Sequence, residues 1–368
     1  MCNLFSIARP FLHLLPPEMA HELSFCAVRY GFLPSGKIST DPIISQNIFG
    51  LEFKNPLGMA AGFDKNAVAI NSLLKQGFGF VEAGTVTPLP QSGNERPRVF
   101  RLSEDHAVVN RLGFNNKGLE YFIRHFYRRD KKLGIAGANI GKNKDTEKAV
   151  DDYVRALHTV YPHADYITIN ISSPNTKGLR DLQQREALSG LLVELSKARS
   201  DATVHHGKRV PLLLKIAPDI DYRQQEDIAE ALLLYAIDGL IISNTTISRP
   251  ASLISKNRNE SGGLSGKPLF QLSTMVLAEM YKLTGGKIPI IGVGGISSAE
   301  DAYTKIRAGA CLVQLYSALI YQGFSLVRDI NNQLPQLLRR DGFTHISEAI
   351  GTAINPSPDS CDIHKIEP

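Results

Sequence analysis

Hydrophobic and polar positions divide the chain into a short first region and a long second one. Within about the first 35 residues, apolar side chains crowd segment 4–15, which contains Pro10 and ends at Pro16-Pro17. A second segment begins near Glu18 and places its apolar side chains three and four residues apart, at Met19, Leu23, Cys26, Ala27 and Tyr30. This spacing is typical of an amphipathic helix. The first region is therefore predicted to be a hairpin of two short helices.

The role of this hairpin is open on periodicity alone. It could cap the main domain, or its apolar surface could meet lipid and admit a ligand. The change in pattern predicts three parts: the hairpin at 1–40, a main domain at 41–353, and a flexible tail at 354–368 that is rich in proline and poor in apolar residues.

The second region repeats a different unit. Short apolar runs rich in β-branched residues alternate with segments long enough for a helix, at 57–61, 80–85, 134–139, 166–170, 211–216, 239–243, 288–293 and 312–315. Nearly continuous apolar strands that alternate with helices indicate a parallel sheet covered on both faces. Eight such units close a (β/α)₈ TIM barrel, and this count argues against an open doubly wound sheet. The predicted fold class is therefore α/β.

Polar residues and glycines gather where these runs end. The ends carry Ala61-Gly62, Thr85, Asn139, Asn170, Lys215, Ser243-Asn244, Gly294-Gly295 and Tyr316-Ser317. Active sites of this fold gather at the C-terminal ends of the strands. We therefore expect Asn139, Asn170, Lys215 and Asn244 to surround a polar ligand over the barrel mouth.

Glycines after the seventh run suggest where an anion binds. Segment 292–295 reads Gly-Val-Gly-Gly, and Tyr316-Ser317 follow the eighth run. Backbone N–H groups can approach a phosphate there. The glycine-rich segment 261–267 does not fit an ATP-binding loop, because Pro268 stands where that motif needs serine or threonine.

Composition and charge remove several functional classes. A net charge of +5 on 368 residues, with no clustered basic face, gives no support for nucleic-acid binding. The four cysteines lie far apart and the histidines form no zinc-binding pattern, so we expect no metal site. No run reaches the roughly 18 apolar residues that cross a bilayer, and the N-terminus lacks a basic segment followed by an unbroken hydrophobic core, so we expect a protein that neither spans a membrane nor is secreted.

Three polar features near the strand ends could carry chemistry. Lys65 and Lys215 lie at or just past strand ends, where one ammonium could pair with a carboxylate and the other could stabilise charge on a reduced ring. Segment 170–176 is the densest polar stretch, but a serine there acts as a base only with help. On the residues alone, an ordinary Asn/Ser/Pro turn is the favoured explanation of that stretch.

Several linked motifs resemble one family, the membrane-associated, quinone-dependent dihydroorotate dehydrogenases. The matching stretches run in order over roughly residues 5–353. They are GMAAGFDK (58–65), EAGTVTP (82–88), RPRVFRL (96–102), NRLGFN (110–115), NIGKN (139–143), NISSPNT (170–176), SNTT (243–246) and GGLSG (262–266).

The resemblance implies an FMN enzyme that oxidises dihydroorotate to orotate in pyrimidine biosynthesis. Ser173 matches the catalytic base of the membrane class, whereas the soluble class has a cysteine at this point. Thr176 and Phe114 match residues along a path by which the proton leaves.

The resemblance also implies two sets of binding residues. Those around FMN are Ala61, Gly62, Phe63, Asp64, Lys65, Thr85, Asn139, Asn170, Lys215, Ser243, Gly266, Gly295, Tyr316 and Ser317. Those around the substrate are Lys65, Asn110, Arg111, Leu112, Gly113, Phe114, Asn170, Asn175, Asn244 and Thr245. Amides that donate and accept, together with one cation, suit a small ring with carbonyls, N–H groups and a carboxylate.

For the hairpin, the resemblance implies a passage by which a membrane quinone reaches the flavin. His21 and Arg101 match polar residues of that tunnel. The expected location is peripheral, on the cytoplasmic face of the inner membrane, and no obligate protein partner is expected. Two rivals are a soluble-class flavin dehydrogenase that uses fumarate or NAD, and a catalytically silent barrel that binds a phosphorylated ligand.

Overall fold

The computed structural model describes residues 4–33 and 41–354 of the chain. Eight parallel strands close into a barrel whose spatial order follows the chain. They are β3 (Leu57–Met59), β4 (Phe80–Val86), β7 (Ile135–Ile140), β8 (Tyr166–Asn170), β9 (Leu212–Ile216), β10 (Gly239–Ile242), β12 (Ile290–Val293) and β13 (Ala310–Leu315). Each coincides with one of the eight predicted runs, so the TIM barrel is confirmed.

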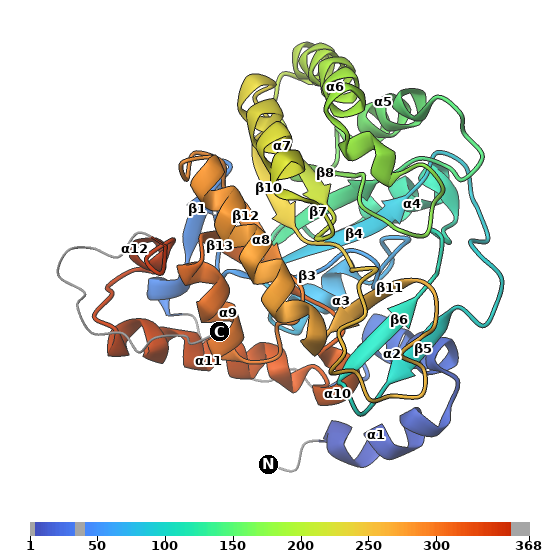
Figure 1. Cartoon of the computed structure of the whole chain (residues 1–368), viewed down its shortest axis with the longest axis vertical. Helices are drawn as coiled ribbons and strands as arrows, with labels where there is room; N and C mark the ends of the chain where they lie inside the picture. Colours follow the sequence, from blue (N-terminus) through green and yellow to red (C-terminus); the bar gives the residue numbers. More distant parts are fainter. Residues whose placement is uncertain (1–3, 34–40, 355–368) are drawn as a thin grey trace.

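Helices follow the strands and surround the barrel (Figure 1). They are α3 (Ile70–Lys75), α4 (Gly118–Phe126), α5 (Ala149–Val160), α6 (Arg185–His206), α7 (Tyr222–Leu234), α8 (Phe270–Leu283), α9 (Ala299–Arg307), α10 (Leu319–Gln322), α11 (Ser325–Arg340) and α12 (Ile346–Ala349). The short 3₁₀ turns are η1 (Pro42–Ile44), η2 (Arg180–Gln183) and η3 (Lys267–Leu269).

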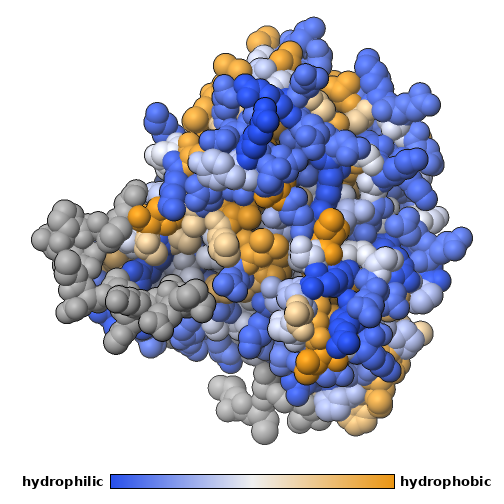
Figure 2. Space-filling model, in the orientation of Figure 1, coloured by the Kyte–Doolittle hydropathy of each residue, from blue (hydrophilic) through white to orange (hydrophobic). Residues whose placement is uncertain are grey.

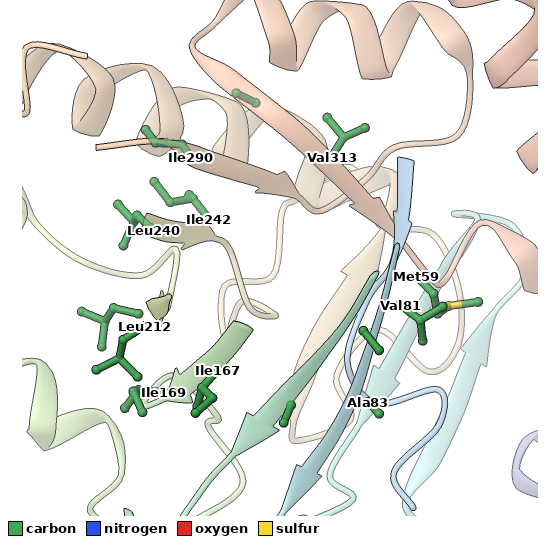
Figure 3. Packing of buried hydrophobic residues seen from close by; sticks show 14 of the residues in the cluster. Met59, Val81, Ala83, Ile167, Ile169, Leu212, Leu240, Ile242, Ile290 and Val313 are labelled. Carbon is green, nitrogen blue, oxygen red and sulfur yellow. The ribbon is translucent and has the colours of Figure 1, made fainter. Parts of the chain in front are cut away.

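Alternation along each strand decides which side chains face the helices and which face the barrel interior. In β9, Leu212 and Leu214 belong to the apolar layer between strands and helices, whereas Leu213 belongs to a separate interior cluster. Figure 3 shows members of the outer layer from several strands, among them Leu212, Ile167 and Ile169. Because Lys215 follows Leu213 by two positions, the same alternation directs its side chain into the barrel.

A β-hairpin closes the N-terminal end of the barrel. Strands β1 (Gln46–Ile48) and β2 (Leu51–Phe53) pair antiparallel. The Phe53 ring packs edge-on against Phe80 at 5.3 Å between centroids, and both belong to the interior cluster with Tyr166. This apolar plug leaves the opposite, C-terminal end for polar chemistry.

A second sheet lies outside the barrel, and the hydrophobic pattern does not predict it. Strands β5 (Val99–Leu102), β6 (Ala107–Asn110) and β11 (Gly263–Gly266) form an antiparallel sheet in which β6 is central. Each has four residues, too few to show a clear alternation. This sheet lies beside the N-terminal helices in Figure 1.

The predicted helical hairpin is confirmed as α1 (Leu4–Leu14) and α2 (Pro17–Arg29). Glu18 of α2 forms an ion pair with Arg98 at 2.8 Å and thereby ties the hairpin to the barrel domain. Phe11 and Leu14 are 69% and 83% exposed. Figure 2 shows hydrophobic residues at the lower right of the molecule, the end at which α1 lies.

Within the described ranges, no helix combines the length and the apolar character that crossing a bilayer requires. The predicted boundary between the hairpin and the main domain lies at residues 40 and 41. Segment 34–40, on its N-terminal side, lies outside the described residues. The predicted tail lies outside them from residue 355 onward. The three-part division of the chain therefore stays a prediction.

Candidate active site

One large cavity connects the C-terminal ends of the barrel strands to the helical hairpin. Its volume is about 1270 Å³. Strand-end residues such as Asn170 and Lys215 line its inner part, and Leu12, Leu23 and Phe25 of the hairpin line its outer part. A single space therefore reaches from polar barrel to apolar hairpin.

Four of the strand-end residues singled out by the sequence form a connected hydrogen-bond chain. The Thr85 hydroxyl donates to Asn139 Oδ1 at 2.6 Å, and Asn170 Nδ2 donates to Thr85 Oγ1 at 2.8 Å. Asn244 Nδ2 lies 2.9 Å from Ser172 Oγ, which itself donates to Asn170 Oδ1 at 2.8 Å. Side chains from four different strand ends thus hold one another in fixed orientations at the rim.

Below this chain, the fully buried carboxylate of Glu82 organises the barrel interior. Its Oε1 accepts from Asn139 Nδ2 at 2.7 Å and lies 4.0 Å from Lys215 Nζ. Its Oε2 accepts hydrogen bonds from three further interior side chains, Tyr166, Thr168 and Gln314. Burial lowers the pKa of Lys215, while the Glu82 carboxylate opposes that shift. The sequence reasoning missed this role of Glu82, although a charged residue at an inward position of an apolar strand is a usable signal.

Ser173 follows β8 on the loop that the sequence identified. Its side chain is buried at the cavity wall, and its Oγ accepts the backbone N–H of Asn175 at 3.2 Å. This is the only hydrogen bond of the Ser173 hydroxyl to any described residue. The hydroxyl therefore remains able to donate to, or accept from, a ligand in the cavity.

Amides also close the side of the cavity next to the loop after β8. Asn175 Nδ2 donates to the backbone oxygen of Asn110 at 3.2 Å, which joins the loop after β8 to the end of β6. Thr245 lies against β11 so closely that a Cβ on Gly263 would meet its Oγ1 at 1.9 Å. Only glycine at position 263 leaves room for this approach.

Arg111 departs from the expected arrangement. Its guanidinium pairs with Glu260 at 2.8 Å and lies over the Phe100 ring at 4.4 Å, and the residue does not line the cavity. Its neighbours Asn110 and Leu112 do line it.

Two adjacent residues of the GMAAGFDK motif have different environments. The Asp64 carboxylate is fully buried and accepts the backbone N–H groups of Asn66, Val68 and Ala69, which shapes the turn before α3. Lys65 lines the cavity, and burial lowers the pKa of its ammonium to about 8. Asp64 therefore holds the loop that presents Lys65.

The glycines after β12 form a cradle that fits a phosphate. Gly294 and Gly295 have φ values of +107° and +79°, and a Cβ on Gly295 would lie 2.5 Å from Phe270 Cα. Among the described residues, the backbone N–H groups of Gly295 and Ser317 have no acceptor. Ser317 Oγ donates to Ser265 Oγ at 2.8 Å, so the loop after β13 meets strand β11 beside the cradle.

At the hairpin end, aromatic rings replace amides. His21 contacts the Phe63 ring edge-on at 5.3 Å, and its Nδ1 lies 3.4 Å from the Tyr316 hydroxyl. Burial, together with the nearby Lys65 ammonium, lowers the pKa of His21 to about 3, so this imidazole is neutral. Arg101 Nη1 donates to the His13 backbone oxygen at 2.9 Å, while its buried Nε has no partner among the described residues.

The structure brings together nearly all of the residues that the sequence singled out. Lining the cavity are His21, Ala61, Gly62, Phe63, Lys65, Thr85, Arg101, Asn110, Leu112, Gly113, Phe114, Asn170, Ser173, Asn175, Lys215, Ser243, Asn244, Thr245, Gly266, Gly295, Tyr316 and Ser317. Asp64, Asn139 and Arg111 do not line it. Asp64 and Asn139 are buried directly behind residues that do.

Comparisons with known proteins point to one family. A family model described as dihydroorotate dehydrogenase matches residues 43–338. Relatives named dihydroorotate dehydrogenase (quinone) include those of Azorhizobium caulinodans, which is 50% identical over 96% of this chain and 99% of its own length, and Rhizobium rhizogenes, 52% identical over 93% and 94%. A solved structure of the Eimeria tenella enzyme in complex with ferulenol has a TM-score of 0.88 at 43% identity, covering 92% of this chain and 96% of that one.

Proposed function

This chain belongs to the dihydroorotate dehydrogenase family, and we propose that it is a quinone-dependent member that oxidises dihydroorotate to orotate in pyrimidine biosynthesis. The relatives that carry this name match nearly the whole chain, hairpin included. The soluble-class alternative, which uses fumarate or NAD, is disfavoured because Ser173 occupies the position of that class's cysteine.

We propose FMN as the cofactor. The Gly294-Gly295 cradle and Ser317 would hold its phosphate, and Lys215, Asn170 and Thr85 would surround its ring. Two observations support the fit of these residues to FMN. The backbone N–H groups of Gly295 and Ser317 have no acceptor among the described residues, and a polar rim lies above Glu82. When bound, the flavin supplies the hydride acceptor. Lys215 would stabilise negative charge that develops on the reduced ring.

Oxidation of dihydroorotate removes a proton and a hydride from neighbouring ring carbons. We assign removal of the proton to Ser173 Oγ, which is buried at the cavity wall and free to face a ligand. Thr176, also buried on this loop, would lie on the path by which the proton leaves. Burial excludes bulk water from the serine and so strengthens its interaction with the substrate.

The substrate is proposed to lie among asparagines from three segments: the end of β6, the end of β8 with its loop, and the loop after β10. Asn110, Asn170, Asn175 and Asn244 would donate to its ring carbonyls and accept from its N–H groups, because an amide offers both functions. Thr245 and the backbone of segment 112–114 would complete this side, whereas Arg111 lies outside the cavity. Lys65 would pair with the carboxylate.

The observation that carries the proposal is the continuity of the cavity from amide rim to hairpin. A quinone is apolar and needs an apolar passage with few polar groups at its inner end. The rings around His21 offer such a passage, and Arg101 offers its Nε as a donor that no other described residue accepts from. The quinone would therefore approach the flavin from the hairpin side.

The exposed apolar side chains of the hairpin support peripheral membrane attachment. Phe11 and Leu14 project from α1 and would enter the interfacial region of a bilayer. We propose that the protein lies on the cytoplasmic face of the inner membrane, where a lipid-soluble quinone can enter between the two helices without leaving the bilayer.

A steady-state comparison of oxidants tests this function. Purified protein is mixed with dihydroorotate and with a ubiquinone analogue, fumarate or NAD as oxidant. We expect a yellow protein that releases FMN on denaturation and that turns over with the quinone alone. Turnover with fumarate or NAD but not with the quinone would contradict the proposal.

A further inference from the structure

Arg180 makes three hydrogen bonds behind the substrate side of the cavity. It begins η2, shortly after the loop that carries Ser173. Its Nε donates to the Ser172 backbone oxygen at 3.1 Å, and its Nη2 donates to the Thr245 backbone oxygen at 2.9 Å. Its Nη1 pairs with Asp219 at 2.9 Å, and the two side chains are only 20% and 12% exposed.

Each of these contacts reaches a different loop of the barrel mouth. Ser172 directly precedes Ser173, Thr245 directly follows Asn244, and Asp219 follows β9. Strands β8, β9 and β10 are consecutive in the barrel. The planar guanidinium thus joins three neighbouring strand ends, with one nitrogen directed to each.

Asp219 also stabilises the loop after β10, which carries Asn244 and Thr245. Its Oδ2 accepts the backbone N–H of Ile247 at 3.1 Å, and its Oδ1 accepts hydrogen bonds from the hydroxyls of Thr246 and Ser248. The carboxylate therefore orients Arg180 and also holds the loop that bears Asn244. A charged pair in this setting makes stronger hydrogen bonds than neutral groups would make.

Neither Arg180 nor Asp219 lines the cavity, so neither can touch the substrate. On the cavity side, the same two loops meet through the 2.9 Å hydrogen bond between Asn244 Nδ2 and Ser172 Oγ. The loops are therefore joined twice, once by this inner bond and once by Arg180 from behind. Two separated links hinder rotation of one loop relative to the other, which a single bond permits.

We propose that Arg180, held by Asp219, is a positioning residue that sets the relation between the Ser173 hydroxyl and the Asn244 amide. The inference rests on the proposed function, because it assigns these two groups to proton removal and substrate binding. Displacement of a reacting group by about 1 Å from a distant change can cost roughly a hundredfold in rate. Reduction of the flavin by dihydroorotate therefore depends on the contacts of Arg180 with the loops after β8 and β10. Entry of the quinone through the hairpin does not depend on them.

The test compares Arg180→Lys with Arg185→Lys in the flavin-loaded full-length protein. Lysine keeps the charge but lacks the planar fork that reaches three acceptors. Arg185 is a matched control five positions along the chain, because it also pairs with carboxylates, Asp227 at 2.7 Å and Glu230 at 2.8 Å, yet is 61% exposed. Asp219→Asn tests the same arrangement independently, because it removes the charge that holds Arg180.

Stopped-flow absorbance measures flavin reduction by dihydroorotate and flavin reoxidation by a ubiquinone analogue, and titration measures orotate affinity. We expect R180K to slow reduction at least tenfold and to weaken orotate binding, with reoxidation within twofold of wild type. D219N should show the same split to a smaller degree, and R185K should match wild type in all three measurements.

Three outcomes would count against this account in different ways. If dihydroorotate reduces the flavin of R180K as fast as that of R185K, and the wild-type protein is reduced normally, this inference alone would be overturned. Equal losses in both half-reactions, or loss of flavin, would assign Arg180 to the fold and overturn its positioning role. Wild-type protein that dihydroorotate does not reduce would overturn the proposed function, and this inference with it.

Discussion

The two ends of the cavity are built from opposite chemistry. At the barrel mouth, amides and hydroxyls are fixed by hydrogen bonds such as that of Asn170 with Thr85, and the buried Lys215 ammonium lies 4.0 Å from the Glu82 carboxylate. At the hairpin, the lining is mainly aromatic and aliphatic, and Arg101 Nε has no hydrogen-bond partner within residues 4–33 and 41–354. A polar substrate that must be oriented at one atom needs the first kind of wall. A lipid-soluble oxidant needs only the second.

The two ends also differ in how they are attached to the fold. The rim residues stand on strand ends of a closed barrel and bond to one another from four strands. The hairpin is anchored to the barrel domain through the Glu18 pairs with Arg96 and Arg98 and carries exposed apolar side chains. Side-chain orientations are therefore fixed most firmly at the rim, whereas the hairpin offers exposed apolar side chains that suit contact with a membrane surface.

The largest expected effect comes from removing the proposed base at the polar end. Ser173→Ala should slow flavin reduction by dihydroorotate about a hundredfold or more, as loss of a positioned base usually does. Stopped-flow reduction measures this rate, and reoxidation by quinone in the same preparation is the control. Near-normal reduction would exclude Ser173 as the base.

An effect of about tenfold per pH unit is expected from the charge of Lys65. Because burial lowers its pKa to about 8, the ammonium is charged below that pH and loses its proton as pH rises through it. Orotate affinity should therefore fall about tenfold per pH unit above 8, since the neutral amine no longer pairs with the carboxylate. Titrations from pH 7 to 10 measure this dependence. Lys65→Met should bind weakly at every pH, and a wild-type affinity that stays flat to pH 10 would contradict the assignment.

An effect of similar or smaller size is expected at the apolar end. The double variant Phe11→Ser and Leu14→Ser should bind anionic vesicles about tenfold more weakly, because each position loses part of the roughly 1.5–3 kcal/mol that full burial of such a side chain contributes. Co-sedimentation measures this binding. Val204→Ser and Leu234→Ser, exposed on α6 and α7, are the matched control. Equal weakening by the two pairs would show that the hairpin is not the attachment surface.

The smallest effect is expected from pH at the hairpin end. His21 has a pKa of about 3 and so stays neutral between pH 5 and 8. The rate of quinone reduction should therefore vary less than twofold through ionisation of this residue over that range. A step near pH 6.5 that disappears in His21→Asn would show that the imidazole ionises after all.

The sequence predicted the barrel well because its strands carry a strong signal. Runs such as Leu212–Ile216 are nearly continuous in apolar residues, and eight of them allow one closed arrangement. Asn139, Asn170 and Asn244 could be grouped for the same reason, since strand ends in this fold converge. The four-residue strands β5, β6 and β11 have no comparable pattern, and their pairing depends on contacts between distant segments.

Side-chain partners behind the cavity were beyond sequence reasoning. The link between Arg180 and Thr245 spans 65 positions, and nothing in either segment indicates the other. Arg111 shows the opposite case: it lies inside a matched motif, yet Glu260 of a distant segment draws its side chain away from the cavity. Motifs identified the rim, while long-range pairing decided which side chains face it.

The most direct test of the two-ended cavity measures both half-reactions after deletion of the hairpin, residues 1–33. Flavin reduction by dihydroorotate and flavin reoxidation by a ubiquinone analogue are followed separately by stopped-flow absorbance. We expect the rate of flavin reduction to stay within about twofold of that of the full chain, and the rate of flavin reoxidation to fall at least tenfold. Equal losses in the two rates would show that the hairpin merely supports the barrel, and would contradict the division of the cavity into two functional ends.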